Sequence, residues 1–242
     1  MRFSKSLLII ALAGSLTACG GSDKKAVDMT DSVDEMTNQM GEMAESHQFT
    51  VQVTNLTAAQ PFSPVAVIAH TDGMLWQIGE PASSALELMA EGGDNSELLA
   101  SEYTLQFASA ESPLPPGQQV TMVLTTGELD SLKISVATML VNTNDAFTGL
   151  NAIDVSSLAV NESLSRTSFS YDAGTEANSE AAGTIPGPAD SGEGFNEMRD
   201  DINRVAMHPG VVTQDDGLAS SVLTSQYKFD NPVARIVITR TQ

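Results

Sequence analysis

The side chains with the clearest chemical potential are carboxylates that follow two apolar strand candidates. Asp145 closes the polar run 142–145, and Asp172 and Glu176 stand four residues apart in the run 170–176 (SYDAGTE). Proteins bind calcium through several oxygen atoms from such loops, and small residues let backbone carbonyls turn toward the ion. Asp145, Asp172 and Glu176 are therefore candidate calcium ligands, although spacing alone favours solvated acids in a chain with 31 acidic residues.

Motifs of the common enzyme classes are not found in this sequence. It contains no G-x-S-x-G elbow, H-E-x-x-H pair, Walker-type phosphate loop or dinucleotide-binding fingerprint. His70 and His208 lack a neighbouring nucleophile motif, so a structural role is favoured for both over a catalytic one. We predict no catalytic residue and no enzyme, and keep as the alternative a hydrolase or carbohydrate-active domain with its site in the loop 173–221.

The charge balance excludes one class of partner. Eleven basic against 31 acidic residues give a formal net charge of −20. Nucleic-acid binding needs clustered Lys and Arg to neutralise phosphates, so no nucleic-acid partner is expected. The negative field instead attracts cations. A single cysteine excludes both an intramolecular disulfide and a cysteine-based zinc site.

The N-terminus has the pattern of an export signal. Arg2 and Lys5 precede an apolar run from Leu7 to Leu16, which is too short to span a bilayer and predicts a signal peptide over 1–18. The run ends in LTAC, with Cys19 as the only cysteine, and resembles the processing site of bacterial lipoproteins. That resemblance implies lipid on Cys19 and a membrane partner, and Gly20 favours the outer membrane. Residues 19–47 are predicted to be an acidic tether.

The remaining residues, 48–242, are predicted to form one all-β domain. Phe49, Val51 and Val53 alternate with polar residues, as in a half-buried strand. Further strand candidates are 65–69, 103–108, 119–125, 132–140, 167–171 and 233–240, separated by turns rich in Pro, Gly and Asn. This pattern predicts an antiparallel β-sandwich, with a long irregular loop from Ala173 to about Ser221.

A short helical insertion is expected between the second and third strands. Pro81 fits the first turn of a helix whose inward face is Leu86, Met89 and Ala90 and which ends at Gly92. The run 94–97 (DNSE) has the spacing of a capping box for a further short helix.

Two of the quoted segments resemble the spondin N-terminal domain family. The segment 139–150 (MLVNTNDAFTGL) is similar to that family's S-x-x-P-S-P-D-W-F-V-G stretch, and 171–176 (YDAGTE) is similar to its Y-D-A-G-T-D/E. The resemblance runs from about Gln48 to Thr239. It implies an antiparallel β-sandwich with one calcium ion, held by Asp145, Asp172 and Glu176. Glu176 stands where animal members usually carry Asp, and Ala146 replaces their aromatic residue.

These inferences lead to one expected function and two alternatives. The leading expectation is an exported lipid-anchored protein whose sandwich binds calcium and acts in adhesion or envelope interaction. The alternatives are the hydrolase named above and a purely structural envelope protein.

Overall fold

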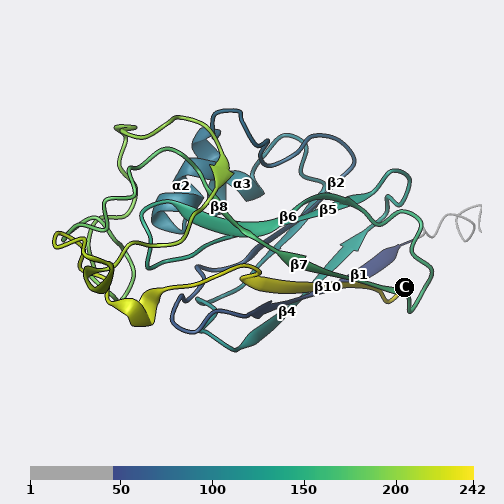
Figure 1. Cartoon of the computed structure of the whole chain (residues 1–242). Helices are drawn as coiled ribbons and strands as arrows, with labels where there is room; N and C mark the ends of the chain where they lie inside the picture. Colours follow the sequence, from purple (N-terminus) through teal and green to yellow (C-terminus); the bar gives the residue numbers. More distant parts are fainter. Residues whose placement is uncertain (1–45) are drawn as a thin grey trace, which may run out of the picture. The chain divides into compact units, whose positions relative to one another are not determined.

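The computed structural model describes residues 46–242, and these form two antiparallel sheets packed face to face (Figure 1). The four-stranded sheet has the order β4 (Gln119–Thr126), β1 (His47–Asn55), β10 (Ala234–Arg240), β7 (Ser163–Ser168). The six-stranded sheet has the order β3 (Gln106–Ser109), β2 (Ala66–His70), β5 (Lys133–Met139), β6 (Ala146–Asp154), β8 (Ser170–Asp172), β9 (Ala206–Met207). The predicted all-β sandwich is confirmed. The signal peptide, Cys19 and the tether up to residue 45 lie outside the described residues.

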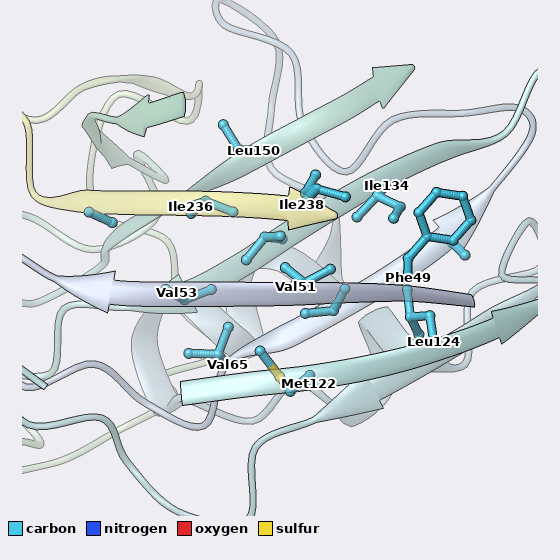
Figure 2. Packing of buried hydrophobic residues seen from close by; sticks show 14 of the residues in the cluster. Phe49, Val51, Val53, Val65, Met122, Leu124, Ile134, Leu150, Ile236 and Ile238 are labelled. Carbon is cyan, nitrogen blue, oxygen red and sulfur yellow. The ribbon is translucent and has the colours of Figure 1, made fainter. Parts of the chain in front are cut away.

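The core between the sheets follows from alternating strands. In β1 every second side chain is buried, and Val51 lies between Ile238 of β10 and Met122 of β4 in the sheet register. Figure 2 shows these side chains packed with Phe49 and Ile134 between the layers. Because successive side chains of a strand point to opposite faces, one face of the four-stranded sheet packs in the core and the other faces solvent. β1 begins at His47, one residue before the predicted domain boundary.

A second apolar cluster covers the other face of the six-stranded sheet. Leu86 and Met89 of α2 (Ser84–Gly92) pack on Met139 and Phe147 of the central strands. Trp76 completes this layer, its ring lying 5.1 Å from that of Phe147. β5 and the first half of β6 are therefore buried on both faces, which explains their continuous apolar composition.

Two details of the predicted helices are wrong. α2 begins at Ser84 and not at Pro81, because the Ser83 hydroxyl caps it by accepting a hydrogen bond from the Leu86 amide at 3.2 Å. The predicted end at Gly92 is confirmed. The capping box over 94–97 does not form: Asp94 accepts from the Ser96 amide in a local turn, and α3 (Ser96–Leu99) has no side-chain cap.

The chain after β8 is irregular over most of its length, as predicted, and gathers at one end of the sandwich (Figure 1). Between β8 and β10 it contains only β9 and two short 3₁₀ turns, η1 (Gln214–Asp216) and η2 (Ser225–Tyr227). Ile185, Val211 and Leu223 form a small apolar cluster that holds this segment together. Within residues 46–242, no helix has the length and apolar character needed to cross a membrane.

Candidate cation-binding site

Strand pairing brings two of the predicted ligands to the same place. Asp145 directly precedes β6, and Asp172 is the last residue of β8. Ala146 pairs with Asp172 across these antiparallel strands, and the Ala173 amide donates to the Asp145 carbonyl at 3.3 Å. The two acids therefore meet at the end of the sandwich where the long loop begins.

Asp145 is a fully buried carboxylate with one unsatisfied oxygen. Its Oδ2 accepts hydrogen bonds from the backbone amides of Thr175 at 2.8 Å and Glu176 at 3.2 Å. Its Oδ1 is buried and accepts no hydrogen bond from any described residue. Burial and the neighbouring charge of Asp172 raise the pKa of Asp145, because both disfavour the ionised form.

Asp172 is held in place by the turn that follows it. Its Oδ1 accepts from the Gly174 amide at 2.7 Å, and its Oδ2 accepts from the Asn178 side-chain amide at 2.6 Å. Gly174 has a φ of +70°, and a Cβ there would collide with the Arg204 backbone, so only glycine fits this position. Burial raises the pKa of Asp172 despite these hydrogen bonds.

The third predicted ligand, Glu176, lies in the same turn, and its carboxylate is bonded to Asn144. Its Oε1 accepts from the Asn144 side-chain amide at 3.1 Å, while its Oε2 is buried without a hydrogen bond among residues 46–242. Burial raises the pKa of Glu176 to about 7, with smaller contributions from the charges of Glu91, Asp200 and Glu193. The acids acting on Asp145 are instead Asp172 and Asp201.

The structure thus brings Asp145 and Asp172 together, and it bonds the Glu176 carboxylate to Asn144, the residue before Asp145. In the described part of the chain, no three side chains of the types His, Cys, Asp and Glu are grouped as a metal site. The turn offers two carboxylates together with backbone carbonyls. A buried oxygen without a donor, beside a second acid, is the environment that a hard cation such as calcium would neutralise.

One acidic residue of this region was missed by the sequence reasoning. Glu91 lies in the last turn of α2, is 1% exposed, and accepts from the Asn196 amide at 2.9 Å through Oε2. Four residues earlier, buried Glu87 forms a two-point ion pair with Arg199, at 2.8 and 2.6 Å. The sequence did carry a signal for these buried acids. The two glutamates are spaced i, i+4 beside the apolar stripe of Leu86, and that spacing puts both on one face of the helix.

Both histidines considered for catalysis are buried. His70 bonds through Nε2 to the Ser135 hydroxyl at 2.9 Å and through Nδ1 to the Asp72 carbonyl at 2.6 Å. His208 is 3% exposed, and burial lowers its pKa to about 4. Its Nε2 meets the Asn178 side-chain oxygen at 3.0 Å, so His208 supports the residue that holds Asp172.

Comparison with known proteins adds no relative: no protein-family model matches the chain, and no curated protein is similar to it at a significant level. The resemblance to the spondin N-terminal domain family therefore rests on the quoted motifs alone and stays a prediction.

Proposed function

We propose that this chain is an exported, lipid-anchored protein whose β-sandwich binds calcium at the end formed by Asp145 and the turn 172–176. The module acts in adhesion or envelope interaction, and Cys19 anchors it to the outer membrane. The anchor and the export signal are proposed from the sequence, and the calcium site from the geometry of the described residues.

The observation that carries the calcium proposal is the buried Asp145 carboxylate. Its Oδ1 lacks a hydrogen bond within residues 46–242, and the nearby acid is Asp172 rather than a basic residue. Two like charges in a buried setting repel each other unless a cation or proton intervenes. Calcium would supply that positive charge, with Asp145 and Asp172 as the carboxylate ligands and Glu176 as the adjoining acid of the same turn.

Calorimetric titration of the chelator-treated full-length chain in detergent tests this proposal. We expect saturable calcium binding, and a weaker response to magnesium, which demands a tighter octahedral shell. Asp145→Asn and Asp172→Asn should each weaken calcium binding at least tenfold. Asp154→Asn is the matched control, because Asp154 is exposed at the opposite end of β6.

Two titration results would overturn the calcium site. One is the absence of saturable calcium binding up to millimolar concentration. The other is binding by both the Asp145 and Asp172 variants as tight as that of the Asp154→Asn control. A melting-temperature rise with calcium that all three variants share equally would likewise place the ion elsewhere.

A further inference from the structure

Within residues 46–242 the two sheets end in four edge strands, and three of these are protected against pairing with a further strand. β3 and β9 are only four and two residues long, and β7 carries the exposed Arg166. Short edge strands and exposed charges are common means by which proteins keep sheet edges from pairing. β4, at the lower margin of the sandwich in Figure 1, is the exception: its eight residues (QVTMVLTT) include no charged residue and no proline.

The register of β4 against β1 identifies the backbone groups at this edge. The Asn55 amide donates to the Gln118 carbonyl at 2.9 Å, so every second facing pair along these antiparallel strands exchanges hydrogen bonds. The amides and carbonyls of the intervening residues point away from β1, and these residues are Gln119, Thr121, Val123 and Thr125. No backbone hydrogen bond joins them to another strand or loop of the described range.

A groove of about 650 Å³ lies beside the first half of this edge. It is lined by residues 118–122 and by the segment 109–115, which leads from β3 toward β4. Leu114 and Met122 give it buried apolar surface, and among the described residues that line it Glu111 is the one with a charge. Because side chains of a strand alternate between two faces, a segment paired with β4 can place every second side chain at the groove.

Charge decides which kind of segment fits this edge. The chain has a formal net charge of −20, so a second copy would bring an equal negative charge to the same place. Like charges oppose such an association, whereas a positive segment is attracted by the field of the whole protein. The exposed Glu111 carboxylate offers that segment a local partner for a basic side chain.

We propose that the β4 edge binds an extended segment of a basic partner protein, which adds a fifth strand to the four-stranded sheet. The outward amides and carbonyls of Gln119–Thr125 supply the main-chain hydrogen bonds, and the groove receives apolar side chains of the segment. Glu111 pairs with a Lys or Arg of the partner. The inference goes beyond the proposed function, because none of these residues takes part in the calcium site at Asp145.

A synthetic peptide of alternating Lys and Val, with the length of β4, is the probe for this edge. By fluorescence anisotropy it should bind saturably to the full-length chain in detergent, and more weakly at high salt because salt screens the charges. The same peptide with N-methylated amides, or with Glu in place of Lys, should bind about tenfold more weakly. In NMR hydrogen-exchange measurements the lysine peptide should slow exchange at the Thr121 and Val123 amides.

Two variants of Thr121 separate edge pairing from general attraction between charges. Thr121→Pro removes a donor that faces away from β1, so it spares the β1–β4 hydrogen bonds, and it should weaken peptide binding about tenfold. Thr121→Val is the matched control, because it keeps the amide and should bind as the wild type does. Glu111→Gln should reduce the preference for the lysine peptide over the glutamate peptide. Asp145→Asn should bind the lysine peptide as the wild type does, which distinguishes this proposal from the calcium site.

Several outcomes would overturn the proposal. The first is the absence of saturable binding, and the second is equal binding by Thr121→Pro and Thr121→Val. Binding of the glutamate peptide as tightly as the lysine peptide would reject a basic partner. Slow exchange at Thr121 and Val123 in the free wild-type chain would mean that a second copy or the chain itself already covers the edge, and sedimentation distinguishes these two. Should Thr121→Pro fail to fold, Glu111→Lys must weaken binding of the lysine peptide, and unchanged binding rejects the site.

Discussion

His208 should make the folded protein sensitive to mild acid. The Gly210 amide donates to Nδ1 at 3.0 Å, so the proton of the neutral ring lies on Nε2 and is donated to Asn178. Protonation would put a second N–H against the Gly210 amide and a charge into a site that is 3% exposed. Both effects agree with the lowering of the pKa to about 4.

The size of the stability loss follows from the difference between the pKa of His208 in the folded chain and its pKa in the unfolded chain. Well above pH 6.5 the ring is neutral in both states and has no effect on the pH dependence. As the pH falls below 6.5, the unfolded chain binds the proton first, and stability is lost until the folded state also binds it near pH 4. The gap corresponds to about 3 kcal/mol, at about 1.4 kcal/mol per pH unit.

Urea unfolding of the full chain in chelator, followed by circular dichroism between pH 7 and pH 4, measures this loss. The comparison is with His208→Phe and His208→Gln, which cannot titrate and differ from each other in packing and polarity. Titrating groups remote from His208 are common to all three proteins, so their contributions cancel in the difference. The wild-type chain should lose about 3 kcal/mol more than either variant over this range. Parallel pH profiles for all three proteins would refute the reasoning.

The remaining predictions concern a side chain and the anchor. Arg199→Gln should lower the free energy of unfolding by about 1–3 kcal/mol in urea titrations, because it leaves buried Glu87 without its partner. The exposed control Arg235→Gln should change it by less than about 0.5 kcal/mol; equal effects would mean that the ion pair is not the cause. Cys19→Ser should move the protein from the membrane fraction to the soluble exported fraction. The released protein should sediment with isolated envelopes in calcium and not in chelator; wild-type protein that is wholly soluble would contradict the anchor.

The sequence by itself determined the sandwich and the inward face of its helix. The alternation of Phe49, Val51 and Val53 with polar residues requires a half-buried strand, since successive side chains point to opposite faces. The stripe of Leu86, Met89 and Ala90 likewise requires a helix packed on one side. Local periodicity carries this information without reference to the rest of the chain.

Strand β6 shows where periodicity stops being informative. Its first five residues are buried on both faces. One face is covered by α2 and by the aromatic rings around Phe147, and the other face is covered by the opposing sheet. A strand in that position loses its alternation and carries Gly149, whose absent side chain allows the Val136 backbone to approach. Its strand character was therefore decided by tertiary burial.

The candidate site also has a part that the sequence predicted and a part that only the tertiary structure decided. The sequence placed Asp145, Asp172 and Glu176 in loops after strands, and antiparallel pairing of β6 with β8 explains why the first two meet. The sequence reasoning did not single out Glu91, which lies 85 residues before Glu176 on a helix chosen for its apolar stripe, although its i, i+4 spacing from Glu87 was available. Only the packing of α2 against the loop after β8 pairs Glu87 with Arg199 and bonds Glu91 to Asn196, since electrostatic contacts depend on distance in space and not along the chain.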